Sequence, residues 1–186
     1  MDKYYYLIAQ LPRLVFNRQN SMNEKSFLAE AGKWLSKRDL GIVSSIKLDG
    51  RAPFKKGPGV WQAYQEFEVK FREEIANWRE ARHNNQDYKP GFFPVSLVKE
   101  GNPLEIEQKL LQFRWNFLDA MEKDHHFDID NLILYMLKLK ILSRLSLFSK
   151  EEGKAAFETL IEENPNPPGG QKNDESESEN VEKEIQ

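Results

Sequence analysis

The sequence predicts an all-α fold, with about six helices around a central apolar helix at residues 131–148 and a disordered acidic C-terminal tail. The central segment is apolar on nearly every side, and a helix of that kind must be covered by other elements. In the segments before it, apolar residues recur at the helical period between helix start signals. We therefore predict one helical domain at residues 1–163, long enough to bury a core, and a disordered tail at residues 164–186.

The first element, residues 3–11, is compatible with a helix or a strand. Its apolar residues form one helical stripe, but its aromatic and β-branched content also suits a strand. A short helix is favoured because no partner strand is apparent downstream, and Pro12 ends it. The stripe comprises Tyr4, Leu7, Ile8 and Leu11.

Two helix start signals follow. Ser21 and Glu24 have the spacing of a capping box, which predicts a helix that runs to about residue 35. Ser36, with Asp39 in the first turn, predicts a second, short helix that ends near Gly50. The core residues expected from the first of these helices are Phe27, Leu28, Ala31, Trp34 and Leu35.

A loop at residues 50–59, rich in glycine and proline, precedes a long predicted helix at residues 60–83. Aromatic residues follow the helical period there, with many charges between them, which predicts an aromatic core stripe opposite a solvated face. The connection at residues 84–102 has apolar residues of its own, so we expect it to be pinned to the domain surface. The stripe of the long helix comprises Trp61, Tyr64, Phe67 or Glu68, Phe71, Ile75 and Trp78.

Three closely spaced helices are predicted after this connection. Asn102 followed by Pro103 is an N-cap residue with proline at the first helical position, and the helix it opens runs to about Lys123. Asp128 restarts the chain as the central helix, and capping-box spacing at Ser149 opens the last helix.

The tail beyond residue 163 has almost no apolar side chains, and it holds two lysines against six acids. Because the whole chain carries −3 and the tail −4, residues 1–163 carry a formal charge of +1. Such a composition cannot offset the entropy of ordering, so truncation at Asn164 should change the melting midpoint by no more than about two degrees. A drop of about ten degrees, measured by circular dichroism, would show that the tail docks on the domain.

The sequence contains no recognised catalytic or cofactor motif. The absence of cysteine excludes disulfides, thiolate metal sites and cysteine nucleophiles, and it fits a reducing compartment. The segment 56–59 lacks the spacing of a phosphate-binding loop, and no serine lies in a nucleophile elbow. The near-neutral body has no basic stripe for nucleic acid. We predict no catalytic residues, no cofactor and no enzymatic activity.

A polar turn is predicted around His125 and His126, beside Asp124, Asp128 and Asp130. Imidazole and carboxylate groups could bind zinc or nickel. Adjacent histidines in a turn diverge, however, and no third ligand is set at helical spacing. A polar turn without a metal is therefore the favoured interpretation.

Neither a membrane span nor a signal peptide is predicted. The central helix approaches the length of a short span, but Lys138, Lys140 and Arg144 interrupt it at a high cost in a bilayer centre. For Lys138 and Arg144 the favoured roles are snorkelling or pairing with acids of neighbouring helices, and pairing across a subunit interface is the alternative. The N-terminal residues lack the basic and apolar regions of a signal peptide.

The segment from Asn102 to Phe157 resembles an uncharacterised bacterial family encoded among V-type ATPase subunits, and residues 3–16 fit the same family. Within the central helix, the pattern Tyr-x-Leu-Lys-Leu-x-Ile-x-x-Arg is distantly similar to the C (or d) subunit of V/A-type ATPases. The residues that carry the resemblance are NPLEIE at 102–107, FRWNFLD at 113–119, HFDID at 126–130, LYMLKLKIL at 134–142 and KEEGKAAF at 150–157.

The resemblance implies a non-catalytic, all-helical subunit or assembly factor of a rotary V-type ATPase, an ion-transport complex. Such a protein would be cytoplasmic, peripheral at the membrane through the complex, and bound to stalk or ring subunits. The C subunit is a funnel-like socket between the central stalk and the membrane ring. It is a considerably longer chain, so this protein could supply only part of a socket.

The expected partner contacts are aromatic loop residues beside proline and glycine, namely Phe54, Phe92 and Phe93. The alternative for each is that the ring covers the core. The alternative function is a stand-alone helical adaptor with another protein as its partner. A small enzyme with an unrecognised site is a third hypothesis, and it predicts a deep pocket with converging polar groups.

Overall fold

The computed structural model describes residues 4–18, 20–51 and 57–148. The chain divides into two compact units, residues 1–148 and 149–186, and all described residues belong to the first. The helix expected from Ser149, the domain end expected at residue 163 and the expected disordered tail therefore lie outside the described residues.

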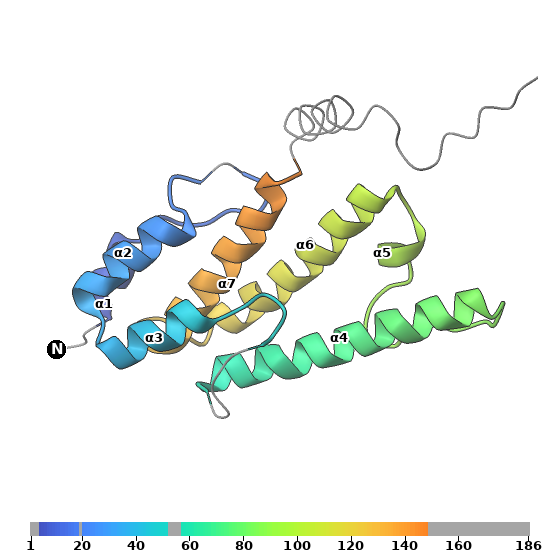
Figure 1. The fold of residues 1–186 in the computed structure, drawn as a ribbon, viewed down its shortest axis with the longest axis horizontal. Coiled ribbons are helices and arrows are strands. Elements are labelled where there is room, and N and C mark those ends of the chain that lie inside the picture. The colour runs from blue at the N-terminus through green and yellow to red at the C-terminus, as the bar shows by residue number, and fades with distance from the viewer. Residues whose placement is uncertain (1–3, 19, 52–56, 149–186) are drawn as a thin grey trace, which may run out of the picture. The chain divides into compact units, whose positions relative to one another are not determined.

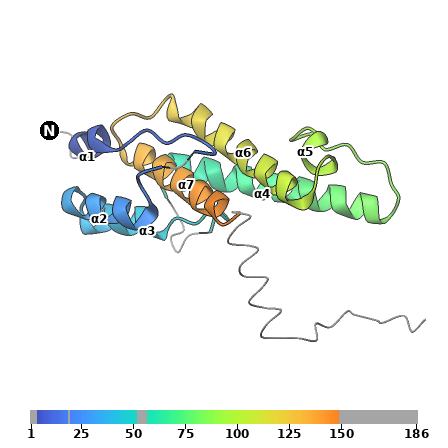
Figure 2. The same cartoon turned by 90° about the horizontal axis from the view of Figure 1, so that it is seen from above.

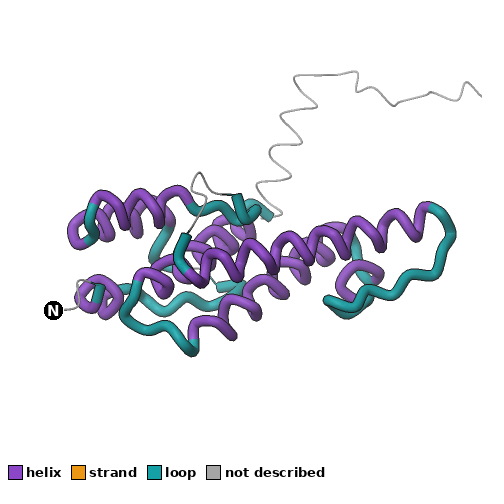
Figure 3. The backbone as a smooth tube through the Cα atoms, turned by 90° about the horizontal axis from the view of Figure 1, so that it is seen from below, coloured by secondary structure: helices purple, strands orange, loops and turns teal. Residues whose placement is uncertain are grey.

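The described residues form seven helices and no strand, which confirms the all-α prediction (Figures 1 and 3). Residues 3–11 contain a helix, as favoured, and a one-turn helix that was not predicted interrupts the connection at 84–102. Helices α1, α2 and α3 lie toward one end of the unit and α5 toward the other (Figures 1 and 2). In chain order the helices are α1 (Tyr5–Gln10), α2 (Glu24–Trp34), α3 (Lys37–Ser45), α4 (Gly59–His83), α5 (Ser96–Lys99), α6 (Pro103–Glu122) and α7 (Ile129–Ser146).

The central apolar helix of the prediction is α7. It packs against α2, α3, α4 and α6, and every residue from Leu132 to Leu139 is buried. Consecutive residues point in all directions around a helix, so burial of the whole run requires packing on every side. The helix begins after Asp128, whose Oδ1 accepts a hydrogen bond from the backbone N–H of Asn131 at 2.8 Å.

Two basic residues of α7 are paired with acids of α6, and Lys140 is paired with Glu24 of α2 at 2.6 Å. The Nζ of Lys138 lies 2.5 Å from Asp119 Oδ1 and 2.6 Å from Glu122 Oε2. The Nε of Arg144 lies 2.6 Å from Glu107 Oε1. The favoured pairing with a neighbouring helix is thus confirmed. Within the described ranges, no helix has both the length and the apolar character needed to cross a membrane.

Two further predicted helix starts are confirmed by their hydrogen bonds. Asn102 and Glu105 form a reciprocal capping box at α6, in which each side chain accepts from the backbone N–H of the other. Ser36 Oγ accepts from Asp39 N–H at 3.2 Å and caps α3. Local sequence determines these starts because the cap and its target are only three residues apart.

The predicted capping box at Ser21 is wrong. Helix α2 begins at Glu24, and its cap is Asn23, whose Oδ1 accepts from the backbone N–H of Ser26 at 2.9 Å. Asparagine caps a helix about as well as serine does, and Asn23 directly precedes the first helical residue, so it takes the role expected of Ser21.

A stack of phenylalanine rings joins α4 to α6. The ring centroids of Phe67 and Phe117 lie 4.0 Å apart, and those of Phe71 and Phe113 lie 5.1 Å apart. The aromatic stripe predicted for the long helix is confirmed, although it buries both Phe67 and Glu68 rather than one of them. The stacked rings of this stripe hold α4 against α6.

Candidate protein-interaction surface

Four exposed aromatic residues form a continuous line of rings on the unit. Tyr5 and Tyr6 belong to α1, Trp34 ends α2, and Phe127 lies in the link between α6 and α7. Their exposed fractions lie between 40% and 48%. The ring centroids are 4.9 Å apart for Phe127 and Tyr5, 5.6 Å for Tyr5 and Tyr6, and 5.8 Å for the stacked Tyr6 and Trp34. We call these four residues the aromatic surface.

Helix α1 turns two tyrosines outward because its other sides are held by the core. Leu7 is fully buried, and the hydroxyl of Tyr4 donates to Asp39 Oδ2 of α3 at 3.2 Å. Successive residues of a helix are about 100° apart, so these two anchors leave Tyr5 and Tyr6 facing solvent. Three tyrosines in a row indicate that not all of these rings are buried, since one helix face cannot bury all of them, but they do not indicate which rings are exposed.

Trp34 was expected in the core and is instead exposed. It shares the helical phase of buried Phe27, but it is the last residue of α2 and stacks on Tyr6. Its indole Nε1 donates to Glu30 Oε1 at 3.3 Å, while Lys33 Nζ lies 2.6 Å from Glu30 Oε2. The hydrogen bonds from Lys33 and then Trp34 lower the pKa of Glu30, so the carboxylate is ionised at neutral pH and orients the indole.

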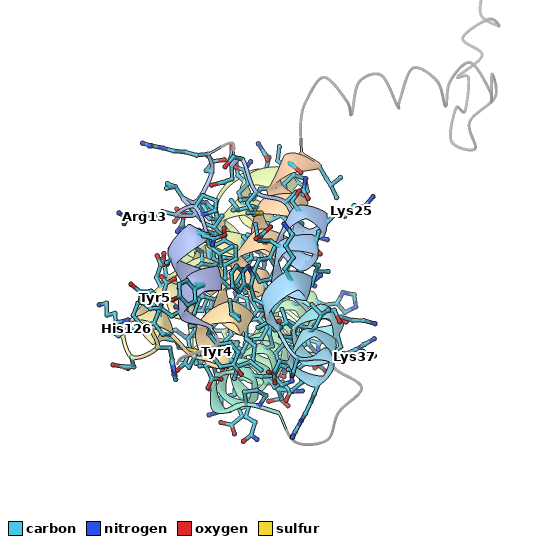
Figure 4. All side chains as sticks on the ribbon, turned by 90° about the vertical axis from the view of Figure 1, so that its left-hand side faces the viewer. Tyr4, Tyr5, Arg13, Lys25, Lys37 and His126 are labelled. Carbon is cyan, nitrogen blue, oxygen red and sulfur yellow. The ribbon has the colours of Figure 1, made fainter. Side chains whose placement is uncertain are left out.

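Exposed cations lie at the same end of the unit as the aromatic surface. Figure 4 faces this end of the unit and shows Tyr5 beside His126, with Arg13 above them and Lys25 and Lys37 on the opposite side. Neither Arg13, Lys25 nor Lys37 forms an ion pair with another described residue. An apolar patch at an end of the unit that carries these exposed cations suits a protein partner that has an apolar pocket with acidic groups nearby.

The predicted contacts Phe92 and Phe93 lie in the α4–α6 connection and pack on α4. Phe93 is 4% exposed with its ring centroid 5.5 Å from Phe71, and the half-buried Phe92 lies 5.5 Å from Phe67. Their positions match the alternative that these rings cover the core. The two rings also attach the connection at residues 84–102 to α4, as expected. Phe54 lies outside the described residues. Serine at position 93 would therefore disturb the core before it tested binding.

Residues 90–164 match DUF2764, a family described as a protein of unknown function. The DUF2764 region contains α5, α6 and α7, where most of the resemblance noted in the sequence also lies. The match supports the expected similarity to an uncharacterised family over these residues. It does not link the chain to V-type ATPases. Of the aromatic surface, Phe127 lies inside the DUF2764 region. No curated protein and no solved structure compared with the chain matches it.

The polar turn of the DUF2764 region brings together His125, Asp128 and Asp130, with one possible ligand atom from each within 4.8 Å of the others. Asp128 caps α7, and its Oδ2 lies 2.8 Å from His125 Nδ1. Asp130 Oδ1 accepts from the backbone N–H of Val60 at 3.2 Å, near the start of α4. Burial raises the pKa of Asp130, and the nearby carboxylate of Asp128 adds to this. These contacts give each carboxylate a role in helix capping that requires no metal.

A hollow of about 640 Å³ lies between the segment 12–16, α6 and α7. Tyr135 lines it, but its hydroxyl donates to the backbone oxygen of Pro12 at 3.0 Å. Burial raises the pKa of Tyr135 to about 12, so the hydroxyl is protonated and remains a donor at neutral pH. Lys138 also lines the hollow, with its Nζ between two carboxylates of α6. The Tyr135 hydroxyl thus attaches the N-terminal segment to α7, and the two carboxylates more than offset the charge of Lys138.

Proposed function

We propose that this protein is a non-catalytic helical subunit or adaptor that binds another protein through the aromatic surface. The observation that carries the proposal is the line of four exposed rings. Burial of apolar surface is favourable, so rings left in contact with water on a folded unit retain binding energy for a partner. Tyrosine and tryptophan are also the residue types that dominate the energetics of protein interfaces.

The proposed partner is a stalk or ring subunit of a rotary V-type ATPase. The resemblance of residues 3–16 and 102–157 to a family encoded with such subunits supports this choice. Because Arg13, Lys25 and Lys37 at the same end of the unit are exposed and unpaired among the described residues, the partner surface should carry acidic groups near an apolar pocket. In this proposal the chain is cytoplasmic and reaches the membrane only through the complex, and nucleotide hydrolysis belongs to other subunits.

Replacing Tyr6, Trp34 and Phe127 together with serine tests the proposal. The wild-type protein, purified by an affinity tag from its native cell in mild detergent, should bring down stalk or ring subunits. The triple variant should recover at least about tenfold less of them, because each lost interface ring weakens binding and every 1.4 kcal/mol is tenfold. Its helical content should be unchanged, since all three rings are exposed.

The matched control replaces three exposed apolar residues elsewhere, Val69, Leu104 and Leu147, with serine. This control should recover the subunits as the wild type does. Equal losses in both triple variants would indicate non-specific apolar contact and contradict the proposed surface. If wild-type preparations contain another protein in place of V-type subunits, and the aromatic variant loses it, the stand-alone adaptor is the correct function.

A further inference from the structure

A second hollow, of about 440 Å³, gathers four guanidinium groups. It is lined by α4, α6, the C-terminal part of α7 and the segment that follows α3. We call it the arginine pocket. Like charges repel, so a hollow that collects four of them has a positive potential unless an equal number of acids opposes them. The four residues are Arg72 and Arg79 of α4, Arg114 of α6 and Arg144 of α7.

Two of these arginines share one buried carboxylate. Glu68 is 1% exposed, and its Oε1 lies 2.5 Å from Arg114 Nε while its Oε2 lies 3.2 Å from Arg72 Nε. Arg114 is further held over the ring of Phe71, at 4.8 Å from the ring centroid. One carboxylate neutralises one guanidinium, so this group of three charges retains a net positive charge beside the hollow.

The acids that line the pocket do not remove this excess. Glu107 pairs with Arg144 at 2.6 Å, and Asp49 lies 3.5 Å from Arg51. Arg79 has no hydrogen-bond or ion-pair partner among the residues that the structure describes. Guanidinium groups therefore outnumber carboxylates here, and Arg79 is left without an anion.

The rest of the lining is apolar. Ile75 of α4 and Leu110 and Leu111 of α6 contribute buried side chains to the wall. The volume is within the range of roughly 300–1,000 Å³ that is usual for small-molecule sites. A planar guanidinium donates two parallel hydrogen bonds to the oxygens of a carboxylate or a phosphate, which makes arginine a selective ligand for both groups.

We propose that the arginine pocket binds a small organic anion. Its phosphate or carboxylate group would lie against Arg79 and Arg72, and its apolar body against the wall formed by α4 and α6. This site shares no residue with the aromatic surface, so it is independent of the proposed function and either can fail alone.

Titration of the full-length, isotope-labelled protein by two-dimensional NMR tests this site directly. The probes are inorganic phosphate, phenyl phosphate and benzoate, with phenol as the uncharged control. Phenyl phosphate or benzoate should give saturable shifts at the Nε of Arg79 and at neighbouring amides of α4, and the tighter of the two identifies the preferred anion. Phenol should give no saturable shift. Equal affinity for inorganic phosphate and phenyl phosphate, or saturation by phenol, would overturn the proposal.

Substitutions at two positions of α4 provide the matched control. Arg79→Gln should weaken binding of the preferred probe by roughly tenfold, because it removes a charge-assisted pair of hydrogen bonds. Arg79→Lys keeps the positive charge but cannot donate two parallel hydrogen bonds to the anion, so it should give an intermediate loss of affinity. Arg82→Gln should leave affinity unchanged, because Arg82 stacks on Trp78 at 5.2 Å and is not part of the lining. Equal affinities for Arg79→Gln and the wild type, or equal losses in Arg79→Gln and Arg82→Gln, would contradict the site.

Discussion

Aspartate in place of Leu137 should abolish cooperative unfolding of the protein. Leu137 is fully buried on α7, the helix that packs against four others. A carboxylate without a partner in such a site costs several kcal/mol, which is comparable with the total stability of about 5–15 kcal/mol of a typical domain. Ile141→Asp should act in the same way, since Ile141 is also fully buried. Thermal melts followed by circular dichroism measure the effect.

The control for this prediction is Leu147→Asp. Leu147 directly follows α7 and is 72% exposed, so a charge there remains solvated. This variant should melt within a few degrees of the wild type, since surface substitutions usually change stability by about 0.5 kcal/mol or less. Wild-type melting curves for both Leu137→Asp and Ile141→Asp would show that α7 is not the centre of the core.

Removal of the Glu68 carboxylate is expected to have the second largest effect. In Glu68→Leu, the largely buried Arg114 loses the partner that its Nε reaches at 2.5 Å. An uncompensated buried charge of this kind costs about 3–5 kcal/mol. Urea unfolding should show this loss as a lower midpoint with an unchanged slope, because the surface exposed on unfolding stays the same.

Two further variants test whether the effect comes from the buried Glu68–Arg114 ion pair and not from a substitution of glutamate on α4 as such. Glu66→Leu on the exposed side of α4 should change stability by no more than about 0.5 kcal/mol. The double variant Glu68→Leu/Arg114→Met should recover most of the stability lost in Glu68→Leu, because it removes both buried charges at once. If Glu68→Leu is as stable as Glu66→Leu, the buried carboxylate contributes nothing to the fold.

Much of the helical layout could be predicted from local sequence. The caps at Ser36, Asn102 and Asp128 each bond to a backbone group three residues ahead, so the signal and its target lie in the same short segment. The run from Leu132 to Leu139 is apolar on all sides, and this alone required neighbours around the helix. The one-turn helix α5 was missed because so short an element has no periodicity to detect.

The aromatic surface could not be predicted in the same way. Phe92 and Phe93 beside proline and glycine had the features expected of exposed loop rings, yet they pack on Phe67 and Phe71. Trp34 had the phase of a core residue, yet it is exposed. In each case the residue type and its local spacing favoured one environment, and the packing of a distant element decided the other.

The sequence by itself determined that this chain forms helices, where most of them begin and that the apolar segment near residue 137 lies at the centre. These properties depend on contacts within a few residues and on hydrophobic periodicity. Only the tertiary structure decided which rings face solvent and which charges meet in the arginine pocket. Glu68 and Arg114 are far apart in the chain, and Tyr6 is far from Trp34, so their contacts exist only after the helices pack. Exposure and charge pairing depend on what reaches a side chain from elsewhere in the fold, and no local pattern contains that information.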